Sequence, residues 1–267
     1  MKFGIIVPTF NRPELVLQAF QSALDQTYSN WEFHVCNDGS SADYSMVENG
    51  IDDPRFFYTR TPENHGCNYA RNVAIEKAIA NQCDFITFMD DEEKLDPRCL
   101  EVAMEKIKAH PDVGWFISNT FGERKPSSRD IVDEGIYSWM DDYLYGKRLR
   151  GDKTHVISVK AMGDLRLDGR FRISNTWRFR LRMNQRTPIW GYPYPSKWIQ
   201  YSEGGITKTP SNIPRTWAEA HSRYVRHWVA ITIRPGKLAA YKYLTLELLK
   251  TPNRALHLLF GKGKKKP

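Results

Sequence analysis

The feature that most constrains the fold of this chain is the alternation of short apolar runs with amphipathic stretches over its first 120 residues. Residues 3–7 are continuously apolar, apart from one glycine, as in strands buried on both faces of a parallel sheet. Pro8 breaks this run, and apolar residues then recur at three- and four-residue spacing over residues 14–26. The pattern predicts a strand, a loop and an amphipathic helix.

The alternation continues further along the chain and predicts an α/β fold. Expected strands cover residues 31–36, 55–59, 84–89 and 113–118, and expected helices cover residues 68–81 and 100–110. Strands that alternate with helices require crossover connections, which produce a mostly parallel, Rossmann-like sheet flanked by helices.

The pattern is weaker after residue 120. Residues 121–155 mix proline, serine, glycine and charge, which is typical of a lid or an irregular insertion. Residues 177–183 have a helical pattern, and residues 216–260 predict two helices that separate near Pro235. We expect a main domain over residues 1–205 and a basic helical extension over residues 206–267.

Charge is distributed unevenly along the chain. Residues 206–267 hold 13 basic and 2 acidic residues, a net charge of +11, whereas the whole chain carries +8. The first 205 residues therefore carry a net charge of −3. Such an asymmetry indicates a polyanionic partner for the extension, either an anionic membrane or nucleic acid. Nucleic acid is the weaker interpretation, because the extension contains no recognisable nucleic-acid-binding module.

The sequence features that bear on location favour the cytoplasm. No run approaches the roughly 18 apolar residues that span a bilayer. The chain enters its first apolar run at residue 3, which leaves no room for a secretory signal. The four cysteines include no Cys-x-x-Cys pair, so their spacing indicates neither a zinc finger nor a disulfide framework. We expect a cytoplasmic protein, with peripheral attachment at the inner face of the membrane through the basic extension.

Three polar segments follow three of the expected strands, at residues 8–11, 37–40 and 90–93. In an open parallel sheet, ligands bind outside the carboxyl ends of the strands, so these segments are expected to converge on one edge. The last segment consists of four adjacent acids, Asp90, Asp91, Glu92 and Glu93. Adjacent carboxylates repel one another, and a hard cation such as Mg²⁺ or Mn²⁺ would offset the repulsion and bridge to a diphosphate. The alternative to a metal site is a solvent-exposed turn whose acids cap the following helix.

Four sequence blocks, in this order, resemble the inverting family 2 glycosyltransferases of GT-A fold. They read IIVPTFNRPELVLQAFQSALDQTY, WEFHVCNDGSS, NHGCNYARNVAI and FITFMDDEEKLDP. The resemblance implies a nucleotide-sugar-binding half over residues 1–120 and an acceptor half over residues 121–205.

The resemblance also implies roles for individual residues on the donor side. The segment Pro8, Thr9, Phe10 and Asn11 would lie at the nucleotide, and Asp38 would hydrogen-bond the base or the ribose. Arg71 and Asp91 would help to hold the donor. The Asp-x-Asp motif of the family matches Asp90, Asp91 and Glu92, so Asp90 and Glu92 would bind the metal.

The general base of the family is missing from its expected position. Where relatives carry Glu-Asp-Trp, this chain has Asn175, Thr176 and Trp177. Threonine cannot accept a proton at neutral pH. Three explanations remain open: a substitute base, with Glu203 and Asp168 as candidates; a weakened or inactive relative that still binds the donor; or a chain altered at these two positions. Glu203 is also a candidate third metal ligand. The alternative is that Glu203 is an exposed glutamate in a loop.

Two further features have alternative interpretations. Trp177, Trp190 and Trp198 are candidates for a platform on which an acceptor sugar stacks, although core packing is the default for such residues. Leu238, Tyr241, Leu244, Leu248 and Leu249 recur at helical spacing among basic residues. Such a helix either lies in a membrane interface or covers the sheet.

The sequence and the resemblance together predict a glycosyltransferase that uses a nucleoside diphosphate sugar, with UDP as the favoured base. The acceptor would be a hydroxyl group of a glycan or of a lipid-linked sugar in cell-surface polysaccharide biosynthesis. The reaction would proceed with inversion and would depend on Mn²⁺ or Mg²⁺. The alternative is a catalytically weakened or inactive protein that binds a sugar nucleotide.

Overall fold

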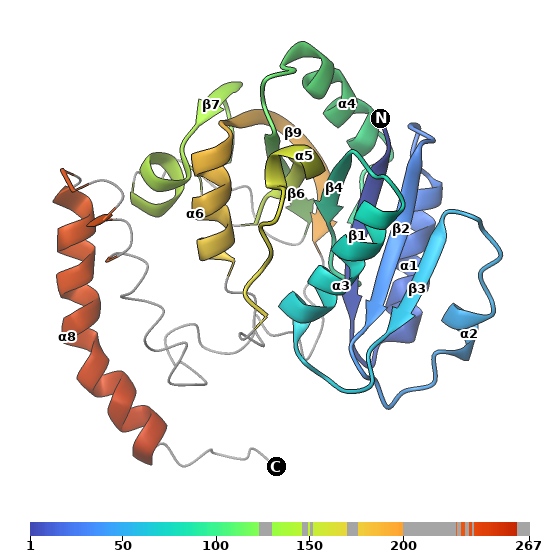
Figure 1. The fold of residues 1–267 in the computed structure, drawn as a ribbon, viewed down its shortest axis with the longest axis horizontal. Helices are drawn as coiled ribbons and strands as arrows, with labels where there is room; N and C mark the ends of the chain where they lie inside the picture. Colours follow the sequence, from blue (N-terminus) through green and yellow to red (C-terminus); the bar gives the residue numbers. More distant parts are fainter. Residues whose placement is uncertain are drawn as a thin grey trace. The chain divides into compact units, whose positions relative to one another are not determined.

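The structure of the protein is a computed structural model. It describes residues 1–122, 130–145, 149, 152–169, 176–199, 228, 231–232, 235–236 and 238–260. The chain divides into two compact units, Met1–Ser202 and Glu203–Pro267. In the first unit, helices pack on both sides of a central sheet (Figure 1).

The sheet of the first unit has nine strands, with the order β3-β2-β1-β4-β8-β6-β9-β5, and β7 pairs with β9. Their bounds are β1 Phe3–Thr9, β2 Trp31–Asn37, β3 Phe56–Arg60, β4 Phe85–Phe88, β5 Glu93–Leu95, β6 Trp115–Gly122, β7 Gly135–Tyr137, β8 Thr154–Ser158 and β9 Ile189–Ile199. Among these strands, only β5, β7 and β8 run against the others. The α/β class and the mostly parallel sheet that the sequence predicts are confirmed.

The described helices are mostly short connections between strands. Their bounds are α1 Pro13–Leu24, α2 Ser45–Glu48, α3 Cys67–Ala80, α4 Cys99–Ala109, the π-helix η1 Trp139–Tyr145, α5 Val159–Met162, α6 Trp177–Arg186 and α8 Leu238–Phe260. Helix α8 belongs to the second unit, and the first of the two helices predicted over residues 216–260 lies largely outside the described residues. None of the described helices has the length and apolar character needed to cross a membrane.

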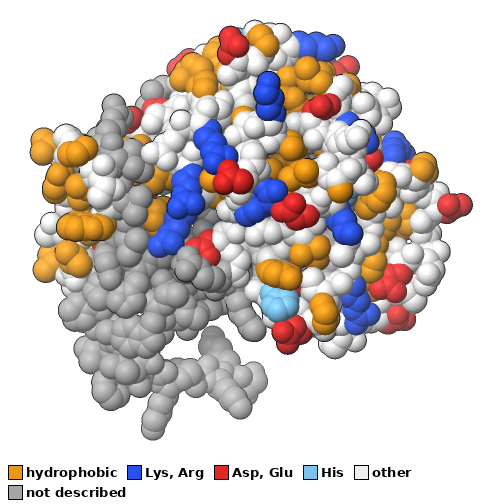
Figure 2. All heavy atoms as spheres, in the orientation of Figure 1, with side chains coloured by type: hydrophobic (Ala, Val, Ile, Leu, Met, Phe, Trp, Pro, Cys, Tyr) orange, Lys and Arg blue, Asp and Glu red, His pale blue; other side chains and the backbone are white. Residues whose placement is uncertain are grey.

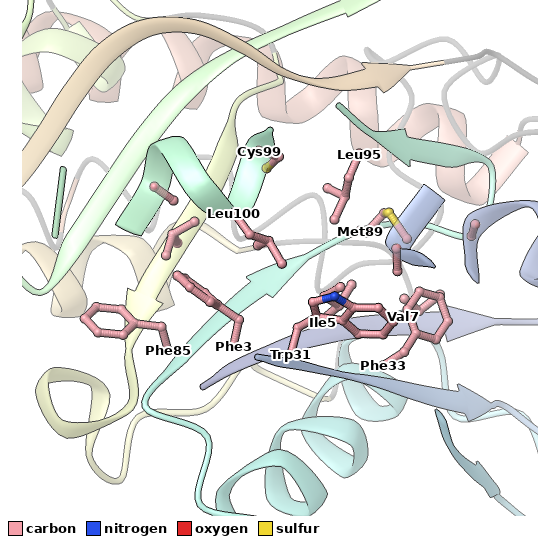
Figure 3. Packing of buried hydrophobic residues seen from close by; sticks show 14 of the residues in the cluster. Phe3, Ile5, Val7, Trp31, Phe33, Phe85, Met89, Leu95, Cys99 and Leu100 are labelled. Carbon is pink, nitrogen blue, oxygen red and sulfur yellow. The ribbon is translucent and has the colours of Figure 1, made fainter. Parts of the chain in front are cut away.

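The two faces of the sheet are covered by different helices because side chains alternate along each strand. Phe3, Ile5 and Val7 of β1 pack in one buried cluster with residues of α1 and α4. Figure 3 shows part of this cluster, in which Leu100 of α4 lies over the strand side chains. On the other face, a Cβ atom at Gly4 would lie 2.9 Å from the Cβ atom of Ala78, so glycine allows α3 to pack closely on β1.

On the face shown in Figure 2, several Lys and Arg side chains form a row over α6, and the other Lys and Arg side chains lie among Asp and Glu side chains. This arrangement agrees with the small net charge of the first 205 residues.

Part of the second half of the first unit is more regular than its composition suggests. Within residues 121–155, expected to be irregular, Thr154 begins strand β8, which inserts between β4 and β6. The aromatic and proline-rich stretch near residue 190 is the eleven-residue strand β9. The acidic run is not a pure loop either, because Glu93 begins strand β5. These strands have few sequence signals because their hydrogen-bond partners are distant in the chain.

Candidate active site

The three polar segments converge at the carboxyl edge of the sheet. Thr9, at the end of β1, donates a hydrogen bond through its hydroxyl to Asp91 Oδ2 at 2.8 Å. Asn11 Oδ1 accepts from the backbone N–H groups of Ser41 and Ala42, at 2.9 and 3.1 Å. Asn11 has a φ of 56°, a left-handed conformation that asparagine tolerates better than most residues. This turn directs the chain into α1 and places Arg12 beside the acidic run.

Each carboxylate of the acidic run has a basic partner within the protein. Arg71, on α3, forms an ion pair with Asp90. Arg12 lies 2.6 Å from Asp91 Oδ1 and 3.0 Å from Glu92 Oε2, and Lys197 of β9 lies 2.6 Å from Glu93 Oε2. The repulsion that led us to expect a metal is therefore offset in part by three protein cations. A bound divalent cation would share Asp90 and Glu92 with Arg71 and Arg12.

The pKa values of the neighbouring acids Asp90 and Asp91 are shifted in opposite directions. Removal from water opposes ionisation of Asp90, but Arg71 and Lys197 outweigh it and lower the pKa of Asp90 below its ordinary value. Burial raises the pKa of Asp91 to about 7, although Arg12 and the Thr9 hydroxyl favour its ionised form. The side chain of Asp90 is 44% exposed, whereas that of Asp91 is fully buried. Asp90 thus offers an accessible, ionised carboxylate. Asp91 is buried and connects Thr9 with Arg12 beneath the surface.

Asp38 holds the segment that precedes α3. Its Oδ1 accepts from the backbone N–H of His65 at 3.0 Å, and its Oδ2 accepts from that of Gly66 at 2.6 Å. Next to it, Gly39 has a φ of +66°, and a Cβ atom there would lie 2.3 Å from the carbonyl carbon of Glu63. Asp38 therefore fixes the start of the helix that carries Arg71. Its expected contact with a base or ribose stays a prediction.

Of the remaining donor-side candidates, Pro8 is buried in β1 and Phe10 is 41% exposed at the edge. The ring of Phe10 is thus accessible at the place where the resemblance puts the nucleotide.

The candidates for the base occupy different parts of the molecule. Asp168 lies over α3, where Asn68 Nδ2 donates to its backbone carbonyl at 3.1 Å. Its carboxylate lies 3.6 Å from Arg178 Nη1. Thr176 directly precedes α6. Glu203 and Asn175 lie outside the described residues.

The three tryptophans expected to bind the acceptor do not lie together. Trp177 is buried at the start of α6, and among the described residues its indole Nε1 has no hydrogen-bond partner. Trp198 lies near the carboxyl end of β9 opposite Lys94 of β5, next to the acidic run. Trp190 lies at the amino end of β9, where it stacks on His110. The structure brings Trp198 to the donor edge and leaves Trp190 at the opposite end of its strand.

Arg12 and Lys197 are the site residues that sequence reasoning missed. Arg12 lies in the short segment between the first expected strand and the first expected helix, directly before a proline, so its position near the strand end was an available signal. Lys197 is 104 residues from its partner Glu93. No local pattern indicates that contact.

Comparison with known proteins gives the same family over most of the first unit. The model of the family described as Glycosyl transferase family 2 matches residues 4–166. The chain is 36% identical over 142 residues to the putative colanic acid biosynthesis glycosyl transferase WcaA of Escherichia coli K12, covering 51% of this chain and 50% of that protein. It is 32% identical over 139 residues to the GalNAc(5)-diNAcBac-PP-undecaprenol beta-1,3-glucosyltransferase of Campylobacter jejuni, covering 51% and 43%. The chain therefore spans about half the length of these curated relatives.

Solved structures with the same fold include two complexes with a sugar nucleotide. S. aureus TarS 1-349 in complex with UDP-GlcNAc superposes with a TM-score of 0.73 at 17% identity, covering 97% of this chain and 73% of that one. The mannosyltransferase PcManGT from Pyrobaculum calidifontis, in complex with GDP-Man and Mn²⁺, gives a TM-score of 0.59 at 16% identity, covering 100% and 76%. These likenesses show the GT-A fold. The family match over residues 4–166 establishes that this chain belongs to glycosyl transferase family 2.

Proposed function

We propose that the protein transfers a monosaccharide from a nucleoside diphosphate sugar, of UDP type, to a hydroxyl group of an acceptor. The observation that carries the proposal is the Arg71–Asp90 ion pair at the carboxyl edge of the sheet, with Asp90 accessible and ionised. An arginine beside an exposed carboxylate can hold a phosphate and, through a cation, a second phosphate. In this proposal residues 1–120 bind the donor and residues 121–205 bind the acceptor.

The residues at this edge fit a divalent cation by their donor atoms. Asp90 and Glu92 offer only carboxylate oxygens, which Mg²⁺ and Mn²⁺ prefer. A bound cation would supply positive charge that stabilises the leaving diphosphate. Arg71 and Arg12 lie against the same carboxylates and would add charge at that place. The ion in the PcManGT complex supports the choice of Mn²⁺ as the first ion to test.

The acceptor in this proposal is a glycan or a lipid-linked sugar. The support comes from the relatives, one of which is named for action on an undecaprenol-linked glycan and another for colanic acid biosynthesis. The basic extension, residues 206–267, would attach the protein to an anionic membrane surface where such lipids lie.

Inversion requires a base that takes the proton of the acceptor hydroxyl as its oxygen bonds to the anomeric carbon and the diphosphate leaves. Among the described acids, Asp168 is the best placed for this role. It contacts α3 through Asn68, three residues before Arg71 on the same helix. Glu203 stays the second candidate.

The test is isothermal titration of the protein with UDP and UDP-sugars in the presence of Mn²⁺. The sharpest comparison is between the acids at the two ends of β4, because Asp84 precedes this strand and Asp90 follows it. The Asp90→Asn variant should bind UDP at least about tenfold more weakly, whereas Asp84→Asn should bind like the parent. If Asp90→Asn and Glu92→Gln both bind UDP as tightly as the parent, the assignment of these acids to the donor site is wrong.

A second function, donor binding without turnover, is favoured by Thr176 at the position of the family base. Binding of UDP in the titration, with neither hydrolysis nor transfer over a broad acceptor panel, would select this alternative.

A further inference from the structure

A cluster of three metal-ligating side chains lies at the end of the sheet opposite the donor edge. Glu32 and His34 are two residues apart on β2, so they point to the same face. Cys83 lies in the segment between α3 and β4 and reaches the same place. The donor edge begins at the other end of β2, after Asn37. The cluster is therefore separate from the acids proposed to bind the donor.

The spacing of the three ligand atoms is that of a tetrahedral zinc site. His34 Nε2 lies 3.0 Å from Glu32 Oε2, Cys83 Sγ lies 3.6 Å from the same oxygen, and Cys83 Sγ lies 3.9 Å from His34 Nε2. Zinc bonds of about 2.0–2.3 Å at tetrahedral angles separate the ligand atoms by roughly 3.4–3.6 Å. Shifts of a few tenths of an ångström would thus place all three atoms around one ion.

The cluster is mostly buried, and Glu32 is its most exposed member. The side chain of His34 is 1% exposed and that of Glu32 is 13% exposed, beside the more exposed Lys2. Lys2 Nζ binds Glu32 Oε1 at 2.8 Å, so the oxygen that faces His34 and Cys83 is the other one. Lys2 can therefore keep its ion pair while Oε2 binds a metal. Asn81 Nδ2 also donates to Oε2, at 3.1 Å, and a carboxylate oxygen has capacity for both partners.

The donor atoms of the cluster suit a metal with a preference for mixed ligands. Burial lowers the pKa of His34, which keeps the imidazole neutral and able to bind a metal. Burial raises the pKa of the Cys83 thiol to about 12, so a metal must displace its proton. Thiolate, imidazole and carboxylate together select Zn²⁺ over Mg²⁺. The oxygen-only acids at the donor edge have the opposite preference.

We propose that Glu32, His34 and Cys83 form a binding site for one Zn²⁺ ion, with a fourth position open to water, that ties strand β2 to the connection between α3 and β4. This site is distinct from the divalent cation of the proposed transfer reaction. The ion would stabilise the end of the sheet at which Lys2 and Asp84 hold β1 and β4 together.

The test uses the full chain, with one metal-free sample titrated with Zn²⁺ and a separate one titrated with Co²⁺ as a spectroscopic probe. A cobalt–thiolate bond gives a charge-transfer absorption band, which carboxylates and imidazoles alone do not produce. The parent should bind one Zn²⁺ ion that survives dialysis and should show the cobalt–thiolate band. Absence of the band in the parent would overturn the proposal, even if Zn²⁺ binds elsewhere.

The matched variants are Cys83→Ala and Cys99→Ala, because Cys99 is a buried thiol in α4 outside the cluster. Cys83→Ala should lose the band, and Cys99→Ala should keep it. Glu32→Gln keeps the size of the side chain and should weaken Zn²⁺ binding at least about tenfold. Retention of the band by Cys83→Ala, or parent-like affinity of Glu32→Gln, would sink the assignment. UDP binding with Mn²⁺ depends on the opposite edge of the sheet in the proposed function. Cys83→Ala and Glu32→Gln should therefore bind UDP like the parent.

Discussion

Arg12 Nη2 lies 2.6 Å from Asp91 Oδ1, and the same guanidinium reaches Glu92 Oε2 at 3.0 Å. One arginine from the segment after β1 therefore bridges two acids that follow β4. The side chain of Asp91 is fully buried, so Arg12 is the charged partner on which its ionised form depends. The contact connects two of the three loops at the donor edge.

Replacing Arg12 with alanine should lower the free energy of unfolding by about 1–3 kcal/mol, because Asp91 would remain buried without a cation. The measurement is urea denaturation at pH 8, where Asp91 is ionised in the parent. Asp91→Asn removes the cost of burying the carboxylate as well as the pair, so it should destabilise the protein less than Arg12→Ala. The double variant should lose less than the sum of the two single losses. Strictly additive losses would show that the pair contributes nothing.

Replacing Asp168, the better placed of the two base candidates, should lower turnover. Asp168→Asn should lower kcat about 10²–10⁴-fold if Asp168 takes the acceptor proton, with UDP affinity changed little. The matched control is Asp164→Asn, whose carboxylate is exposed and pairs with Arg186 on the surface. Unaltered kcat in Asp168→Asn would move the role to Glu203.

Thr176→Asp places a carboxylate where the family has its base, at the start of α6. The helix N-terminus favours a negative charge there. If the donor site is intact, this variant should raise kcat above that of the parent. Thr176→Asn, which has nearly the same shape without the charge, should not. Equal rates for the two variants would argue against Thr176 as the vacated base position.

The parallel half of the fold was predictable because its signals are local. β1, α1, β2 and α3 each have a continuous apolar run or a helical repeat in the sequence, and their observed bounds lie within about two residues of those expected. The convergence of the polar segments then follows from the topology alone, since parallel strands end at one edge.

Strands β5, β8 and β9 were not predictable, because distant partners determine them. Strand β9 contains Pro193 and Pro195, which argue against a central strand. The structure accommodates Pro195 at a shift of register opposite Asn119, where regular strand pairing is interrupted. The buried contact of Lys197 with Glu93 was not predictable for the same reason, because the two residues are far apart in the sequence. Sequence reasoning named the acidic run and Arg71, but it missed Arg12 and Lys197, which pair with acids of that run.

The basic extension predicts binding to anionic vesicles. Leu248 and Leu249 of α8 are exposed, and Lys264, Lys265 and Lys266 follow this helix in the sequence. Replacing these three lysines with glutamine should weaken binding to phosphatidylserine vesicles by about 3 kcal/mol, roughly a hundredfold, at low salt. Co-sedimentation measures this change. Equal binding to vesicles of neutral lipid would contradict an electrostatic attachment.

His155 should make the stability of the protein depend on pH below neutrality. This side chain is buried in β8, and its Nδ1 accepts from the indole Nε1 of Trp115 at 3.2 Å. Burial lowers the pKa of His155 well below 6.5, and the charges of Arg180 and Lys197 lower it further. The imidazole therefore stays neutral in the folded protein while the unfolded chain takes up a proton as the pH falls below about 6.5.

The sign of the effect follows from this difference in proton uptake. Because the unfolded state binds more protons, the free energy of unfolding falls with decreasing pH, by up to about 1.4 kcal/mol per pH unit below 6.5. His155→Gln keeps an acceptor for Trp115 but cannot be protonated, so it should lose less stability than the parent between pH 6.5 and 5.5. Urea denaturation of both proteins at these pH values and at pH 7.5 and 8.5 measures the difference. Between pH 7.5 and 8.5 the gap between them should be constant, because histidine is neutral in both states. A parallel loss in both proteins below pH 6.5 would show that His155 is protonated in the folded state.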